Sequence, residues 1–168
     1  MKLRLLLTLV ITAFVASGCG QKDTPAAGSA GAAPATAAPA AGPRTIEITA
    51  GDTMKFSLVS IEAKAGENLK IILTNIGTQP KESMGHNWIL LKKDADAMAF
   101  ATAAMVARDT EYVPAALKDQ IITQIELLGP RKSGEVTFKA PTEPGEYTFL
   151  CSFPAHFLTG MKGVLVVK

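Results

Sequence analysis

The segment 151–161 brings together three side chains whose ligand atoms suit a soft metal ion. Cys151, His156 and Met161 supply a thiol, an imidazole and a thioether on one short stretch ahead of the last apolar run. A site with two imidazoles, one cysteine thiolate and a weak axial methionine is typical of copper proteins that transfer single electrons. The chain contains only two histidines, so His86 is the remaining candidate for the second imidazole. We therefore expect one copper ion bound by His86, Cys151, His156 and Met161.

The first residues have the layout of an export signal. Lys2 and Arg4 precede an apolar run over residues 5–15, which is too short to span a bilayer comfortably. The small residues directly before Cys19 resemble the end of a bacterial lipoprotein signal. That resemblance implies that residues 1–18 are removed and that Cys19 is diacylated, which would hold the protein stably at a membrane. The alternative is an ordinary signal peptide in which Cys19 is incidental.

Removal of the signal changes how the charges and the cysteines are interpreted. Residues 1–18 include two of the 17 Lys and Arg and none of the 15 Asp and Glu, so the processed chain is nearly neutral. Its charge therefore gives no indication of nucleic-acid binding. If Cys19 is lipidated, Cys151 has no disulfide partner within the chain. Metal ligation explains such a thiol, and on the cysteine alone a buried inert thiol explains it equally well.

A low-complexity stretch follows the signal. Residues 20–43 are almost entirely Ala, Pro, Gly, Ser and Thr, with no aromatic or branched aliphatic side chain. This composition buries too little apolar surface to offset the conformational entropy of the chain. We expect a disordered tether over residues 19–43 and one folded domain, with a single hydrophobic core, over residues 44–168.

The domain shows the pattern of short β-strands separated by turns. Apolar and polar residues alternate around Ile46, across residues 54–61 and across residues 135–139. Residues 94–108 break this pattern, because Asp94 is a plausible N-cap and the Ala- and Met-rich stretch after it indicates a helix packed outside the sheets. About eight short strands with one helical insert predict an all-β fold, a two-sheet Greek-key β-sandwich.

Two of the expected strands place candidate ligands. In an extended strand, His86 shares a face with Trp88, and Cys151 shares a face with Phe149, so both are predicted to point into the interior. A histidine beside a core tryptophan is more often a satisfied core residue than a ligand. The case for His86 as a ligand is stronger because His156 is the only other imidazole in the chain.

Two motifs resemble those of the cupredoxins, in particular the azurin and auracyanin branch. They are Met84-Gly85-His86-Asn87-Trp88 and Cys151-Ser152-Phe153-Pro154-Ala155-His156, and the stretch Met161-Lys162-Gly163 is similar to the start of the last strand in that branch. The resemblance covers residues 44–168 and implies a type 1 blue copper site. Four residues separate His156 from Met161, as in auracyanins and one more than in azurins. The domain also lacks the cysteine pair of the azurin disulfide, so auracyanin-like is the closer description.

The resemblance also implies roles for neighbouring residues. The Gly85 carbonyl would be a weak ligand or neighbour of the copper ion, and Asn87 would tie the two ligand loops together. Backbone N–H groups of Asn87 and Phe153 would approach the Cys151 sulfur. The ring edge of His156 would reach the surface as the route for electrons. Around it the resemblance implies a docking patch of Met84, Pro154, Ala155, Phe157 and Leu158. The alternative is that the last two side chains of this set pack inward.

Together these features predict an exported, lipid-anchored blue copper protein on the periplasmic or outer side of a bacterial membrane. It would carry single electrons between a protein donor and a protein acceptor through weak, transient contacts. We do not expect an enzyme, because no histidine flanks Cys151 and none is left for a second metal site. Copper storage or delivery is the alternative function. Proteins of that kind tend to expose Met and His clusters, whereas Cys151 is predicted to face inward.

Overall fold

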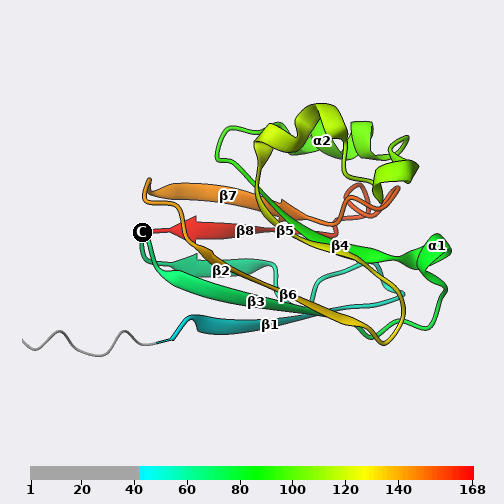
Figure 1. Ribbon diagram of the computed structural model, residues 1–168, viewed down its shortest axis with the longest axis horizontal. Coiled ribbons are helices and arrows are strands. Elements are labelled where there is room, and N and C mark those ends of the chain that lie inside the picture. Colours follow the sequence, from blue (N-terminus) through cyan, green and yellow to red (C-terminus); the bar gives the residue numbers. More distant parts are fainter. Residues whose placement is uncertain (1–41) are drawn as a thin grey trace, which may run out of the picture. The chain divides into compact units, whose positions relative to one another are not determined.

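The computed structural model describes residues 42–168, and these contain eight strands, two short α-helices and two 3-10 helices (Figure 1). The predicted signal, Cys19 and the tether as far as residue 41 lie outside the described residues. In chain order the elements are β1 (Arg44–Ala50), β2 (Ser60–Ala63), β3 (Asn68–Asn75), α1 (Lys81–Met84), β4 (His86–Leu91), α2 (Ala97–Ala104), η1 (Arg108–Thr110), η2 (Ala115–Gln120), β5 (Ile121–Leu128), β6 (Ser133–Lys139), β7 (Gly145–Leu150) and β8 (Lys162–Val167).

The strands form two sheets that stack face to face. One has the order β1-β3-β6, and the other has the order β2-β8-β7-β4-β5. β1 pairs with β3 and β2 pairs with β8 in parallel, whereas the other pairs are antiparallel. The helical insert that contains α2 covers the outer face of the five-stranded sheet (Figure 1). The predicted all-β, two-sheet sandwich with a short helical insert is confirmed.

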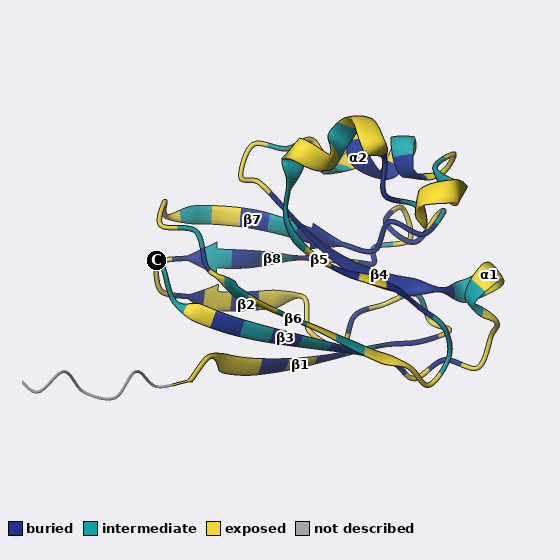
Figure 2. Cartoon of the chain, viewed as in Figure 1, coloured by how far each residue is buried: buried dark blue, intermediate teal, exposed yellow. Residues whose placement is uncertain are grey.

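Apolar side chains fill both faces of the five-stranded sheet. Between the sheets, the Trp88 ring lies 5.4 Å from the Phe149 ring and 6.2 Å from the Phe138 ring, centroid to centroid. A second cluster lies beneath α2 and consists of Ile89, Leu91, Phe100, Ala101, Val113, Leu150 and Phe157. β4 lies between the two clusters, so all six of its residues are buried and it appears dark blue along its length in Figure 2.

The predicted strand over residues 54–61 is wrong except at its end. Met54 has a φ of 54° in a tight turn, and among the residues between β1 and β2 only Phe56 bridges to a strand, at Ala50. The regular strand begins at Ser60. Phe56 is nevertheless only 5% exposed. The alternating pattern therefore reports the burial of this ring and not a continuous strand.

The helical insert begins later than predicted. Asp96, and not Asp94, is the N-cap of α2, since its carboxylate accepts a hydrogen bond of 2.9 Å from the backbone N–H of Ala99. After α2 the chain forms two 3-10 helices, with Glu111 and Tyr112 between them at φ values of 52° and 63°. Within residues 42–168, no helix has both the length and the apolar character needed to cross a membrane.

Gly163 in β8 occupies a position where the packing leaves no room for a side chain. A Cβ atom there would overlap the ring of Phe149 and the carbonyl oxygen of Val59. Gly163→Ala is expected to lower the free energy of unfolding by about 1–3 kcal/mol through overpacking, as measured by urea denaturation of the metal-free full-length protein. Gly42→Ala is the control, because nothing lies within 4 Å of the added carbon. Equal stability of the two variants would contradict this packing.

Candidate metal centre

The strand topology brings the predicted ligands to one end of the five-stranded sheet. His86 is the first residue of β4, Cys151 directly follows β7, and Met161 directly precedes β8. Because β7 is antiparallel to both β4 and β8, the end of β7 meets the beginnings of its two neighbours. His156 lies in the loop from β7 to β8, which folds back over this end of the sheet (Figure 1).

Three buried donor atoms converge at this end. Ligand atoms of His86, Cys151 and His156 all lie within 4.8 Å of one another, and the Cys151 sulfur is 3.4 Å from Nδ1 of His156. Cys151 and His86 are 0% exposed, and His156 is 2% exposed. Neither ring nitrogen of His86 has a hydrogen-bond partner among the described residues. Buried polar atoms are normally paired, so these nitrogens are available to bind a metal ion.

Met161 adds a thioether to the same end of the sheet. Its side chain is fully buried, its backbone N–H donates to the His156 carbonyl at 2.9 Å, and its carbonyl accepts from the Cys151 N–H at 3.1 Å. These two bonds hold the beginning and end of the ligand loop together. Two imidazoles, a thiol and a thioether form a donor set that fits copper. The set does not fit calcium or magnesium, which prefer oxygen ligands.

Asn87 joins the two segments that contain the ligands. Its side-chain amide donates to the Ser152 hydroxyl at 2.8 Å, and its side-chain oxygen accepts from the Ser152 backbone N–H at 2.8 Å. A register shift between His86 and Trp88 marks an irregularity at Asn87 in the pairing of β4 with β5. Such irregularities re-aim side chains near functional sites. Ser152 is not among the predicted site residues, and a polar residue directly after the candidate cysteine is the signal that could have found it.

Gly85 is required where the chain enters β4. A Cβ atom at this position would lie 2.7 Å from the Lys81 carbonyl oxygen and 2.9 Å from Cγ of Leu127. Any larger residue would push the start of β4, and with it His86, away from the other ligands. The role of the Gly85 carbonyl as a weak copper neighbour stays a prediction.

Burial keeps the thiol protonated in the metal-free protein. Removal from water raises the pKa of Cys151 to about 12, and the backbone N–H groups of Asn87 and Phe153, which point at the sulfur, offset this only in part. A thiolate is the form that binds metal, and a cation beside the sulfur favours it. The site therefore has a thiol that ionises when a metal ion arrives and stays inert otherwise.

Burial also keeps both imidazoles neutral, which is the state that binds metal. It lowers the pKa of His156 to about 4, and the neighbouring His86 lowers it further in the same direction. Burial lowers the pKa of His86 as well, while the Gly51 carbonyl, which is near the ring but outside hydrogen-bond geometry, and the Asp52 carboxylate raise it by a smaller amount. Neither histidine has to release a proton at neutral pH before a metal ion binds.

The ligand loop packs differently from the predicted docking patch. Phe157 is only 6% exposed and lies in the cluster beneath α2, so its predicted place on the surface is wrong. Burying the Phe157 ring in this apolar cluster is more favourable in free energy than leaving it exposed to solvent. The other four predicted residues remain at the surface, Ala155 and Leu158 exposed and Met84 and Pro154 partly exposed.

Two aromatic rings cover one side of His156. The Phe153 ring lies 4.7 Å from the imidazole, and Tyr112 packs edge-on against Phe153 at 4.9 Å, centroid to centroid. Tyr112 belongs to the helical insert and sits in the left-handed region of backbone space. No spacing in the sequence indicates this contact, because it depends on the path of the insert over the sheet.

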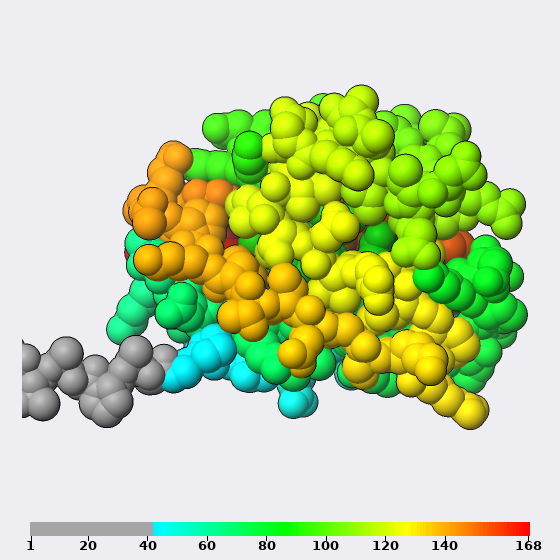
Figure 3. Space-filling model, viewed as in Figure 1, coloured from blue at the N-terminus to red at the C-terminus, as the bar shows by residue number. Residues whose placement is uncertain are grey.

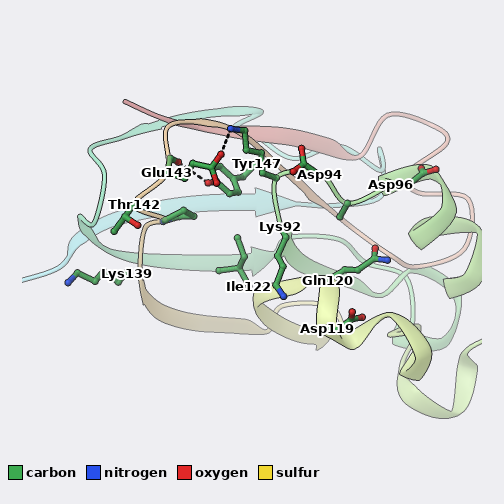
Figure 4. A pocket seen from close by; sticks show the side chains of 13 residues that line it. Lys92, Asp94, Asp96, Asp119, Gln120, Ile122, Lys139, Thr142, Glu143 and Tyr147 are labelled. Carbon is green, nitrogen blue, oxygen red and sulfur yellow. Dashed lines mark hydrogen bonds and ion pairs between the residues drawn. The ribbon is translucent and has the colours of Figure 1, made fainter.

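A surface cleft of about 840 Å³ lies at the other end of β4 and is separate from the metal centre (Figure 4). Lys92 and Lys93, which directly follow β4, line this cleft. They lie six and seven positions after His86, which corresponds to about 20 Å along an extended strand. Charged side chains dominate it, and the Lys93 ammonium donates to the Glu143 carboxylate at 2.6 Å. No histidine, cysteine or methionine lines this cleft, so it is not an alternative site for a soft metal ion.

The metal-free protein is expected to lose stability in acid through His156. The pKa of this group is about 4 in the folded protein and about 6.5 in the unfolded chain. Between these values the unfolded chain binds a proton that the folded protein excludes, so the free energy of unfolding decreases as the pH falls from about 6.5 to about 4. Urea denaturation across this range measures the effect. His156→Phe should show a shallower decrease, and an unchanged slope would contradict the prediction.

Known copper proteins are similar to this chain over almost the whole described part. The model of the copper binding proteins of the plastocyanin/azurin family matches residues 44–168. Auracyanin-B of Chloroflexus aurantiacus is 34% identical over 126 residues, which cover 74% of this chain and 52% of auracyanin-B. The chain thus spans about half the length of that relative. Azurin of Pseudomonas chlororaphis is 34% identical over 127 residues, which cover 73% of this chain and 97% of the azurin.

Solved structures agree with this relationship. The sodium dithionite-reduced auracyanin of Roseiflexus castenholzii superposes with a TM-score of 0.66 and 32% identity, over 76% of this chain and 99% of that protein. The buried donor set fits the metal that the family binds. The chain therefore belongs to the plastocyanin/azurin family of copper-binding proteins, the cupredoxins, and its cofactor is one copper ion.

Proposed function

We propose that this protein is an exported, lipid-anchored blue copper protein that carries single electrons between protein partners. Its family and its donor set support electron transfer by copper as the general activity. The observation that carries the proposal is the convergence of His86, Cys151 and His156 in a buried site next to the buried Met161. The lipid anchor and the protein partners are the parts of this proposal that go beyond electron transfer by copper.

The residues of the chain hold the donors in one arrangement. Bound copper supplies the exchange of one electron between Cu(I) and Cu(II). His86 on β4 and Cys151 at the end of β7 are fixed by their strands and by the two hydrogen bonds between Asn87 and Ser152, so the donors move little when the charge of the site changes. The N–H groups that point at the Cys151 sulfur reduce its electron density and thereby tune the reduction potential.

His156 is the proposed route for electrons to and from the surface. The ligand loop, coloured orange-red, shows only as a small area between the helical insert and the segment around α1 in Figure 3. Exposed apolar side chains continue from Leu158 on this loop to Met105 and Val106 after α2, and Leu158 and Met105 line one small crevice. Exposed apolar side chains beside the ligand loop suit weak, transient contacts with a redox protein.

The buried thiol argues against copper storage or delivery as the main function. Delivery requires ligands that a receiving protein can reach, whereas Cys151 is 0% exposed. A copper enzyme with a second metal centre is also disfavoured, because both histidines of the chain lie in the one site. We therefore propose a carrier without catalytic activity.

Cys151→Ser tests the copper site directly. The copper-loaded full-length protein is expected to show an intense visible absorption band, which arises from the bond between Cu(II) and a cysteine thiolate. The band should disappear in Cys151→Ser, because a hydroxyl group cannot replace the thiolate. Met161→Leu is the control and should keep copper and the band while shifting the reduction potential. A band that survives in Cys151→Ser would sink the assignment.

Cys19→Ala tests the anchor. The wild-type protein is expected in the membrane fraction of a bacterial host, since two acyl chains on one residue anchor stably. Cys19→Ala should move it to the soluble fraction and leave the visible spectrum unchanged, because the copper site lies in residues 86–161. A variant that stays with the membranes after a high-salt wash would count against lipidation.

A further inference from the structure

The Lys55 side chain contacts the ligand loop, which lies far from it in the sequence. It lies in the irregular segment between β1 and β2, and its ammonium donates a hydrogen bond to the carbonyl oxygen of Thr159, two residues before Met161. A carbon added at Gly160 would lie 2.7 Å from Nζ of Lys55, so the ammonium also lies against Gly160. Lys55 therefore contacts the part of the loop that separates His156 from Met161.

The loop cannot satisfy this carbonyl by itself. Residues 155–161 turn like a short helix, in which the Thr159 N–H donates to the Ala155 carbonyl at 3.0 Å. The last carbonyl oxygens of a helical turn find no N–H donor within the turn. Basic side chains commonly bond to such carbonyls at the ends of helices. Lys55 takes this role for Thr159 from a distant part of the chain.

The other side of the loop is fixed by different contacts. Phe157 is inserted in the cluster beneath α2, and Nζ of Lys162 lies 4.5 Å from the centroid of its ring. By contrast, Thr159 is exposed, and Gly160 has a φ of 94°. The other hydrogen bonds of Thr159 and Gly160 stay within the loop, so the bond from Lys55 is the one that ties this exposed half to a distant segment of the chain.

The backbone around Lys55 is itself well held. Met54 packs against the main core, and Phe56 is buried and bridged to Ala50. The lysine therefore extends from a fixed point, and only its own side chain has to be ordered when it binds the loop. One hydrogen bond from this fixed segment is therefore enough to restrict the motion of the loop.

We propose that Lys55 is a positioning residue that closes the ligand loop between His156 and Met161, an inference that rests on the proposed electron-carrier function. Its hydrogen bond keeps the four intervening residues in one conformation and so fixes the approach of Met161. Its positive charge beside the loop favours the reduced over the oxidised state of the copper site.

Three variants separate the hydrogen bond from unspecific effects. Lys55→Met removes the donor and the charge at similar length, Lys55→Arg keeps both, and Lys118→Met removes the charge of a lysine without an ion pair in the described part of the chain. In the metal-free full-length protein, amide hydrogen exchange of residues 157–161 should be about threefold to tenfold faster in Lys55→Met. Exchange of these loop residues should be unchanged in Lys55→Arg and Lys118→Met. Exchange of the residues in β3 should be unchanged in all three variants.

The reduction potential of the copper-loaded protein is the second readout. It should fall in Lys55→Met, return in Lys55→Arg and stay unchanged in Lys118→Met. Unchanged exchange of the loop in Lys55→Met, or an equal fall in potential in Lys118→Met, would overturn the role of Lys55. A wild-type protein that binds copper without the intense visible band would instead contradict the proposed function, whichever way the Lys55 variants behave.

Discussion

The structure depends on burying a thiol and two imidazoles side by side, with no ion pair to any of them among the described residues. Cys151 and His86 are fully buried, and His156 is nearly so. Burial raises the pKa of the thiol and lowers the pKa of both imidazoles, so the metal-free site consists of neutral donors. Each buried polar atom without a partner destabilises the fold by about 1–3 kcal/mol. A bound cation would offset this cost at His86, because a ring nitrogen that has no partner in the metal-free protein would become a ligand.

The surrounding fold tolerates this cost because polar groups next to the ligands are paired and the strand that bears His86 is packed on both faces. Asn87 and Ser152 pair with each other, and both ring nitrogens of the ligand His86 remain unpaired among the described residues. β4 is packed on both faces, by the Trp88 ring stack inside the sandwich and by the cluster beneath α2. An element buried on both sides has little freedom to collapse onto an empty site. The donors therefore stay in place when no metal ion is present.

The sequence predicted those features that depend on short-range periodicity and rare residue types. Strand alternation placed Cys151 and His86 in the interior, and the scarcity of histidine selected the pair. Features that depend on distant segments could not be predicted. The inward turn of Phe157 requires α2, and the alternation across residues 54–61 comes from one buried ring, Phe56, which a pattern of period two cannot distinguish from a strand.

Burial of the Phe157 ring alone is not enough to keep the ligand loop in one conformation. Burial of a phenylalanine such as Phe157 contributes about 2–3 kcal/mol. Fixing the backbone of one residue costs about 1–2 kcal/mol, so this ring offsets the ordering of one or two residues and not of the whole stretch 153–160. The remainder has to come from the hydrogen bonds inside the loop and from contacts at its exposed side. Those contacts determine how firmly His156 and Met161 are held, while the Leu158 side chain stays exposed and adds nothing to the order of the loop.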